Sequence, residues 1–322
     1  MSAEPYGESA EPYGKSAELY GELRPRAFGI AYQMLGSVSE AEDVVQEAFL
    51  RMHQTLRRGE SIASPQAYVA TLVTRLAIDQ LRSARVRRER YVGEWLPEPL
   101  FTDPSPAEYA ETADSMSLAF LVLLESLTPQ QRAAFLLREV FDYPYPEVAE
   151  IVGTDVDSAR HLVARARNHV RERRPRYHAS RRQREELAER FFAAAGQGDL
   201  PALEELLAQD VALHGDGGGR APAAGRPVNG RDRVGRALVA AMSALPRLGV
   251  RVEVTEVNGQ PGGMAFDSQD RLVGVIGLDI ADGRVQTIHS IVNPDKLRHF
   301  GRVGDLAALV RADRAPRRPP NP

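Results

Sequence analysis

The 322-residue sequence predicts a multidomain chain in which two all-α units precede an α+β domain. Apolar residues recur at helical spacing over residues 23–90 and again over 112–173. Beyond Arg184, two short helical patterns lead into four alternating apolar runs, with turn signals at Asn258-Gly259 and Asp282-Gly283. A chain of this length suits two or three domains of roughly 100–200 residues each.

Composition excludes several classes of site. The chain has no cysteine, which excludes disulfides, thiolate metal sites and cysteine nucleophiles. Its seven histidines never form a His-Glu-x-x-His pattern, so we expect neither a metal nor a cofactor. No apolar run approaches the roughly 20 residues of a membrane span, and the N-terminus lacks a signal-peptide pattern. We therefore expect a cytoplasmic protein without a membrane partner.

The first 22 residues repeat one heptapeptide three times, starting at Ser2, Ser9 and Ser16. Pro5, Pro12 and the recurring glycines oppose a continuous helix, so we predict a disordered repeat tail over 1–22. At the other end, Arg and Pro dominate from Arg311 onward, and we predict a C-terminal tail over 301–322.

Three helices are expected within 23–90. Ser39 is placed to cap the second helix, and Ser64-Pro65 opens the third. The second helix carries a polar stripe beside exposed apolar residues, which suits either the docking of another helix or plain solvated surface. The third helix leaves a basic face free, and arginine favours phosphate and base contacts. The stripe comprises Asp43, Gln46, Glu47 and Leu50, and the basic face carries Arg75, Asp79, Arg82 and Arg85.

Charge alternates along the helical part. Residues 75–91 contain six arginines and two acids, residues 94–125 contain seven acids and no Lys or Arg, and residues 160–184 contain ten arginines and one acid. Two phosphate-facing surfaces joined by an acidic, Pro-rich linker over 91–111 would produce this order. Solvated helix faces are the plainer interpretation of either basic block alone.

A helix-turn-helix is predicted within 112–176. Helices are expected near 112–126, 129–140 and 145–152, and Gly153-Thr154 then turns into a longer basic helix from Val156 to about Arg173. Ala149 is small where two helices cross, and Val156 and Leu162 are expected to pack inward. The start of the longer helix can reach base edges and its later arginines can reach phosphates. These residues are Asp157, Ser158, Arg160 and His161, followed by Arg165, Arg167 and Arg171.

After a basic linker over 177–184, an α+β domain is predicted over 185–300. Helices are expected near 185–196, 200–208 and 231–245, and strands near 249–257, 263–267, 271–280 and 284–292.

Three motifs in order resemble the extracytoplasmic-function (ECF) sigma factors over about 23–175. They are Glu42-Asp43-Val44-Val45-Gln46-Glu47-Ala48-Phe49, Arg75-Leu76-Ala77-Ile78-Asp79-Gln80-Leu81-Arg82 and Pro146-Glu147-Val148-Ala149-Glu150-Ile151-Val152-Gly153. Three further motifs are similar to those of group 41, which fuses a SnoaL-like cone domain to the sigma core. They are Trp95-Leu96-Pro97-Glu98-Pro99, Asp216-Gly217-Gly218-Gly219-Arg220 and Asn293-Pro294-Asp295-Lys296-Leu297.

The resemblance implies a sigma2-like domain over 23–90, a sigma4-like domain over 112–176 and a SnoaL-like domain over 185–300. Core RNA polymerase would be a partner through its largest-subunit clamp helices and its flap, with promoter DNA as the second partner. Asp43, Gln46, Glu47 and Phe49 would contact the clamp helices. Arg75, Asp79, Arg82 and Arg85 would lie at the -10 element, and Arg160, His161, Arg165 and Arg167 would read or anchor the -35 element. Leu162 stands where most of the family has a basic residue.

The third domain is expected to regulate rather than catalyse. His214, Asp216 and His289 would be adequate for proton transfer in a cone cavity, and such a cavity could take a small molecule. Three successive glycines after Asp216 instead favour close approach of another backbone, for which the acidic linker with Trp95 is the best candidate. We therefore predict a sigma factor, not an enzyme, controlled by its own SnoaL-like domain. The alternatives are a DNA-tethered isomerase or cyclase, and a helix-turn-helix repressor.

Overall fold

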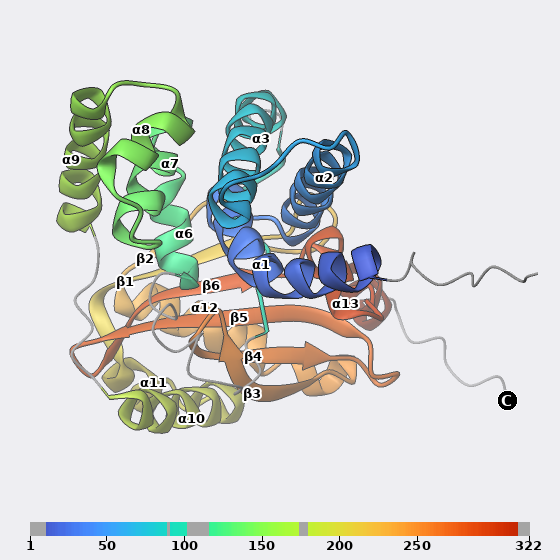
Figure 1. Ribbon diagram of the computed structural model, residues 1–322. Helices are drawn as coiled ribbons and strands as arrows, with labels where there is room; N and C mark the ends of the chain where they lie inside the picture. Colours follow the sequence, from blue (N-terminus) through green and yellow to red (C-terminus); the bar gives the residue numbers. More distant parts are fainter. Residues whose placement is uncertain (1–10, 89–90, 102–115, 174–179, 315–322) are drawn as a thin grey trace, which may run out of the picture. The chain divides into compact units, whose positions relative to one another are not determined.

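The computed structural model describes residues 11–88, 91–101, 116–173 and 180–314. The chain divides into two compact units. The first combines Met1–Ala84 with Leu127–Arg167 and is helical where described; the second combines Arg85–Ser126 with Asn168–Pro322 and contains the sheet (Figure 1).

The first unit begins with three helices, α1 (Glu11–Leu35), α2 (Val38–Arg57) and α3 (Pro65–Arg88). α1 starts inside the segment predicted to be a tail, because Pro12 lies in its first turn, where a missing N–H costs no helical hydrogen bond. α2 is capped by Ser37 rather than by the predicted Ser39: the Ser37 side chain accepts from the N–H of Glu40. α3 opens at Pro65 as predicted.

The unit also contains α7 (Pro129–Glu139), α8 (Tyr145–Val152) and α9 (Val156–Arg173), of which α8 and α9 form the predicted helix-turn-helix. Gly153 ends α8 in the left-handed conformation at φ 78°. Ala149 is buried, as expected, but Leu162 is only half-buried, and Val163 supplies the inward apolar side chain instead.

A buried arginine joins the two groups of helices in the first unit. Arg132 on α7 is 1% exposed, and its Nε donates to the Gln33 carbonyl on α1 over 2.9 Å. Arg26 on α1 donates to the Phe141 carbonyl and lies 4.9 Å from the Tyr143 ring centroid. Complete burial lowers the pKa of Arg132 to about 9.

The second unit is built on a six-stranded sheet of order β2-β1-β6-β5-β4-β3 (Figure 1). β1 and β6 are parallel and every other pairing is antiparallel. The last four strands match the predictions within three residues, whereas β1 and β2 were missed: β1 occupies the end of a predicted helix and the loop after it. The strands are β1 (Leu207–Asp216), β2 (Val228–Asn229), β3 (Arg251–Val257), β4 (Gln260–Phe266), β5 (Leu272–Ala281) and β6 (Arg284–Ile291).

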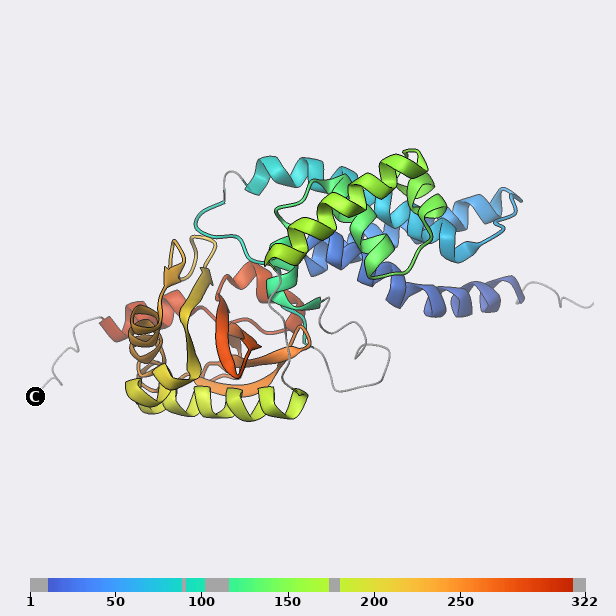
Figure 2. The ribbon, with the colours of Figure 1, turned by 90° about the vertical axis from the view of Figure 1, so that its left-hand side faces the viewer.

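Helices α10 (Arg181–Gln197), α11 (Leu200–Leu206) and α12 (Arg231–Met242) share one hydrophobic core with the sheet. Figure 2 shows the strands curving, with α10 running along one side of the sheet. Phe191 and Leu203 from the helices pack in this core with Leu278 and Ile288 from the strands.

A second core lies on alternate strand residues, which point to the other face of the sheet. Val275 and Ile291 pack there with Leu96 of the linker, with Leu118 of α6 (Leu118–Leu124) and with Leu297 of the 3₁₀ helix η2 (Pro294–Phe300). The linker thus packs on this face of the sheet together with α6 and η2.

The remaining elements are the 3₁₀ helix η1 (Leu245–Leu248) and α13 (Leu306–Arg314), which forms inside the predicted C-terminal tail. Among the residues described, none of the helices has the length and apolar character needed to cross a bilayer.

Candidate functional site

The linker is anchored at a buried carboxylate at the end of β1. Asp216 is fully buried, and its Oδ2 accepts from the Leu96 N–H over 2.8 Å. Its Oδ1 accepts from the Tyr91 hydroxyl over 2.5 Å and from the Gly218 N–H over 3.1 Å. A carboxylate with this many donors holds a linker backbone and a linker side chain at once.

A buried lysine neutralises this carboxylate. The Nζ of Lys296, on η2, lies 2.6 Å from Asp216 Oδ2 and also donates to the Leu96 carbonyl. The same ammonium lies 4.1 Å from the Trp95 ring centroid and 5.1 Å from that of Tyr91, within cation–π range. Leu96 therefore has both backbone groups bound while its side chain is buried in the second core.

Two of the three glycines after Asp216, Gly218 and Gly219, permit this close approach. A Cβ on Gly218, which has φ 55°, would lie 2.3 Å from Asn293 Nδ2, and one on Gly219, at φ 70°, would lie 3.1 Å from Val92. A Cβ on Gly217 would meet the Ala221 carbonyl. Asn293 in turn donates from Nδ2 to the Tyr91 hydroxyl over 2.7 Å. Side chains at Gly218 and Gly219 would therefore displace the linker.

Polar contacts continue along the linker on both sides of Leu96. His214 Nδ1 lies 2.6 Å from Glu94 Oε1, and His299 Nε2 lies 2.7 Å from the Pro99 carbonyl. Glu94 and His299 were not singled out from the sequence, because nothing local marks residues that meet only in the folded domain. Arg220 pairs with Asp295 over 3.0 Å within the domain and contributes to the loop that faces the linker.

The predicted regulatory residues thus gather at one place. Asp216, Asn293 and Lys296 bind Tyr91 and Leu96 directly, while Pro97 and Leu297 are buried beside them. Pro294 opens η2, which positions Lys296. Burial and the hydrogen bond to Asp216 raise the pKa of Tyr91 well above its ordinary value, so the phenol stays protonated and donates.

The residues considered for proton transfer lie on the linker face of the sheet. His214 and His289 are register partners on β1 and β6, and each alternates with a residue of the helix-covered core, Leu213 or Ile288. His289 is buried and its Nε2 lies 2.8 Å from Asp279 Oδ2, and the His214 ring is stacked 5.5 Å from it. The Asp216 carboxylate accepts hydrogen bonds from Tyr91 and Leu96 of the linker. Among the described residues, no group of three His, Cys, Asp or Glu could hold a metal.

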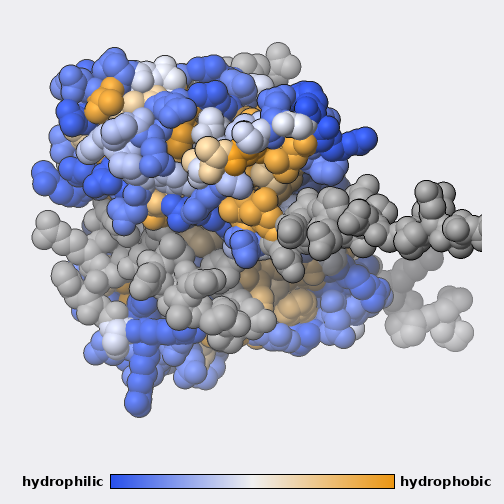
Figure 3. All heavy atoms as spheres, viewed as in Figure 1, coloured by the Kyte–Doolittle hydropathy of each residue, from blue (hydrophilic) through white to orange (hydrophobic). Residues whose placement is uncertain are grey.

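The predicted polymerase-facing residues are only partly exposed. On α2, Asp43 and Gln46 are exposed, and Leu50 is 51% exposed. Phe49 is buried, with its ring 4.5 Å from that of Tyr20. Figure 3 shows apolar patches among the mostly hydrophilic surface of the helices.

The predicted -10 residues lie on α3. Arg75 donates to two carbonyls at the C-terminal end of α8, those of Glu150 over 2.9 Å and Ile151 over 3.2 Å. Arg82 and Asp79 are exposed, and Arg82 Nη1 lies 3.3 Å from Asp79 Oδ1. The side chain of Arg85 falls outside the part of the chain described.

The predicted -35 residues lie along α9. Arg160, His161 and Arg165 are exposed. Ser158 is engaged at the start of the helix, where its N–H and hydroxyl donate to Asp155, and Asp157 pairs with Arg160 over 2.9 Å. Arg167 binds Glu139 of α7 through two nitrogens, which fixes its guanidinium on the neighbouring helix.

Family models match three successive regions. Residues 19–87 match sigma-70 region 2, residues 117–170 match sigma-70 region 4, and residues 188–292 match a SnoaL-like domain. The chain is 38% identical to the ECF RNA polymerase sigma factor SigJ of Mycobacterium tuberculosis, over 85% of this chain and 90% of that protein. The chain belongs to the ECF RNA polymerase sigma factors.

Further comparisons agree with this assignment. This ECF sigma factor is 33% identical to the probable ECF RNA polymerase sigma factor SigI of M. tuberculosis, over 83% of this chain and 90% of that one. The crystal structure of M. tuberculosis SigJ is similar at a TM-score of 0.71 and 34% identity, covering 87% of this sigma factor and 98% of SigJ. The helical sigma domains and the α+β SnoaL-like domain predicted from the sequence are thereby confirmed.

Proposed function

We propose that the protein directs core RNA polymerase to promoters and that its own SnoaL-like domain controls this activity by holding the linker. The control by the SnoaL-like domain is supported by one observation: the buried Asp216–Lys296 pair binds Leu96 and Tyr91 of the linker. A linker held by both backbone groups of one residue is restrained over residues 91–96, between the sigma2-like and sigma4-like domains.

In this proposal the exposed side of α2 binds the clamp helices of the polymerase, and α9 meets the flap and the -35 element. Asp43, Gln46 and the apolar Leu50 offer a mixed surface that suits a partner helix. Phe49 supports this surface from within the unit. Action on bacterial DNA with the polymerase implies a cytoplasmic location.

For the -10 element we propose Arg82 as a phosphate or base contact, with Arg75 joining it once its contacts to α8 are released. On α9, the exposed Arg160, His161 and Arg165 lie where a helix-turn-helix reaches DNA, and Arg167 is oriented by Glu139.

The SnoaL-like domain acts as a regulator in this proposal, not as an enzyme. The linker covers Asp216, and His214 is engaged by Glu94 of the linker. A substrate would have to displace the linker before reaching either group. A small-molecule ligand that did so would act as an inducer.

The deciding experiment is run-off transcription with purified core polymerase and the full-length protein. Transcripts should appear only with both components, and Lys296→Met, which leaves the buried Asp216 carboxylate without its partner charge, should raise their amount at a fixed polymerase concentration. Tight promoter binding without polymerase, and no transcript with it, would indicate a repressor instead.

A further inference from the structure

One residue outside the six motifs binds both Leu100 of the linker and Met116, which lies beyond the end of the linker. Asn258 is the first residue of the turn between β3 and β4 and is fully buried. Its backbone N–H donates to the Leu100 carbonyl and its Oδ1 accepts from the Leu100 N–H, both over 2.8 Å. Its Nδ2 donates to the Met116 carbonyl over 2.9 Å. Asn258 therefore joins Leu100 of the linker to Met116, which follows the linker in the chain.

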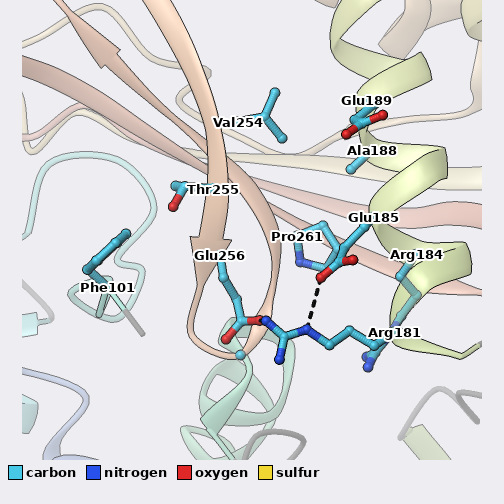
Figure 4. A pocket seen from close by; sticks show the side chains of 11 residues that line it. Phe101, Arg181, Arg184, Glu185, Ala188, Glu189, Val254, Thr255, Glu256 and Pro261 are labelled. Carbon is cyan, nitrogen blue, oxygen red and sulfur yellow. Dashed lines mark hydrogen bonds and ion pairs between the residues drawn. The ribbon is translucent and has the colours of Figure 1, made fainter. Parts of the chain in front are cut away.

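The turn that carries Asn258 is braced by the domain. Phe101 pairs with Val257 at the end of β3, beside Asn258. From the other side, Arg184 of α10 donates to Gln260 Oε1 over 2.7 Å, and Arg181 pairs with Glu256 over 2.9 Å. Figure 4 shows Phe101, Arg181, Arg184 and Glu256 around a hollow of about 290 Å³ between β3 and α10. The linker is thus bound to a fixed point.

The β5–β6 hairpin contains the same turn, and no hydrogen bond joins that turn to the described residues of the linker. Asn258 and Gly259 have φ 53° and 71°, and Asp282 and Gly283 between β5 and β6 have φ 52° and 69°. Asp282 is exposed, whereas Asn258 is buried. Because the backbone conformation is the same, the turn itself does not require a buried amide side chain. The burial of Asn258 reflects its contacts with the linker.

Joining residues 100 and 116 shortens the reach of the linker. At about 3.5 Å per residue, the chain between them could otherwise contribute roughly 55 Å to a fully extended tether. The -10 and -35 elements are separate segments of the promoter, so the sigma2-like and sigma4-like domains that would bind them must be able to move apart. Holding residues 100 and 116 together limits how far the two domains can separate.

We propose that Asn258 is a latch, separate from the Asp216–Lys296 anchor, that holds Leu100 and Met116 at one point of the SnoaL-like domain and releases them when the protein engages polymerase and promoter. This inference rests on the proposed function. Asn258 acts as a positioning residue, since it restrains the linker without contacting DNA.

The test uses full-length Asn258→Gly, which removes the side chain and tolerates the positive φ, with Asp282→Gly as the matched control. Hydrogen exchange of the free proteins is the first readout. Loss of the Oδ1 acceptor should speed exchange of the Leu100 amide by about tenfold in Asn258→Gly. Asp282→Gly should match the wild type. Equal protection of Leu100 in all three proteins would refute the latch.

A second variant distinguishes the contact of Asn258 with Leu100 from its contact with Met116. Asn258→Asp keeps the acceptor for the Leu100 N–H but places a carboxylate oxygen against the Met116 carbonyl. Faster exchange is expected around Leu118 and not at Leu100. Trp95 fluorescence should stay unchanged in both Asn258 variants, because the Asp216–Lys296 anchor is intact. A changed Trp95 signal would mean that the two anchors are one unit and would overturn the proposal.

The functional readout is run-off transcription at sub-saturating polymerase, where Asn258→Gly should give several-fold more transcript than the wild type and the Asp282→Gly control. In the wild-type promoter complex, the Leu100 amide should lose its protection. Persistent protection in an initiating complex would refute opening of the latch. If the wild type fails to initiate at all, the proposed function fails, while exchange in the free protein still decides whether Asn258 anchors the linker.

Discussion

Lys296 Nζ lies 2.6 Å from Asp216 Oδ2, and 7% of the lysine side chain and none of the aspartate side chain is exposed to solvent. Removing one partner of a buried pair leaves an uncompensated charge in the interior. Lys296→Met should therefore destabilise the docked linker by about 3–5 kcal/mol. Urea unfolding followed by Trp95 fluorescence measures this loss.

The paired variant Asp216→Asn with Lys296→Met is the control for that prediction. Because neither charge remains, it should recover most of the stability lost in Lys296→Met. Equal losses in the single and double variants would mean that the lysine contributes only packing.

Replacing Tyr91 by Phe should weaken docking by about 1–2 kcal/mol, because the Asp216 carboxylate loses a donor and the Asn293 amide loses its acceptor. Trp95 fluorescence in a urea titration at neutral pH reports this change.

The same variant should alter the pH dependence of stability. The pKa of Tyr91 is raised in the folded protein above its ordinary value of 10.0, so its contribution is complete below pH 10.0 and is lost as pH rises further. Tyr91→Phe should show a smaller loss of stability above pH 10.0 than the wild type. Identical alkaline profiles would contradict the hydrogen bond to Asp216.

Gly218→Ala should undock the linker, because Gly218 has a positive φ and an added Cβ would meet the Asn293 amide. Backbone strain of this kind costs about 1–3 kcal/mol before the steric clash is counted. Gly225→Ala is the matched control from the same loop, since no atom lies within 4 Å of its added Cβ. Limited proteolysis of the linker should increase in Gly218→Ala alone.

Comparing Arg75→Ala with Arg82→Ala should distinguish a loss of DNA binding from a loss of packing between α3 and α8. If both residues contact phosphate, each variant should reduce the salt dependence of promoter binding by about one unit of log–log slope. Only Arg75→Ala should also lower the free energy of unfolding of the helical unit, because Arg75 alone of the two binds the α8 carbonyls. Filter binding of the polymerase complex across a salt series provides the slopes.

Leu50→Asp should weaken polymerase binding at least tenfold without changing stability by more than about 0.5 kcal/mol, because Leu50 is exposed beside the polar stripe of α2. Leu56→Asp is the control: Leu56 is also exposed but lies on another side of the same helix. A pull-down with tagged core polymerase compares them. If the wild type, Leu50→Asp and Leu56→Asp bound polymerase equally well, the proposal that this side of α2 contacts polymerase would be wrong.

Local patterns were sufficient for the helix-turn-helix and for the last four strands. Gly153 marks the end of α8, and the Asn258-Gly259 and Asp282-Gly283 turns fix two hairpins, because each signal acts within a few residues. β1 was missed for the opposite reason. Its sequence from Leu207 to Asp216 lacks strict alternation, and its main partner β6 lies about 75 residues away.

The sequence by itself determined the order of the domains, the helical faces and the motifs around Trp95, Asp216 and Lys296, since periodicity, capping and spacing are properties of adjacent residues. Only the tertiary structure decided that Asp216 and Lys296 meet at Leu96, that Arg75 binds α8, and that Asn258 holds both Leu100 and Met116. These contacts join residues far apart in the chain. Their stability comes from burial that exists only after the sheet and the linker have packed together.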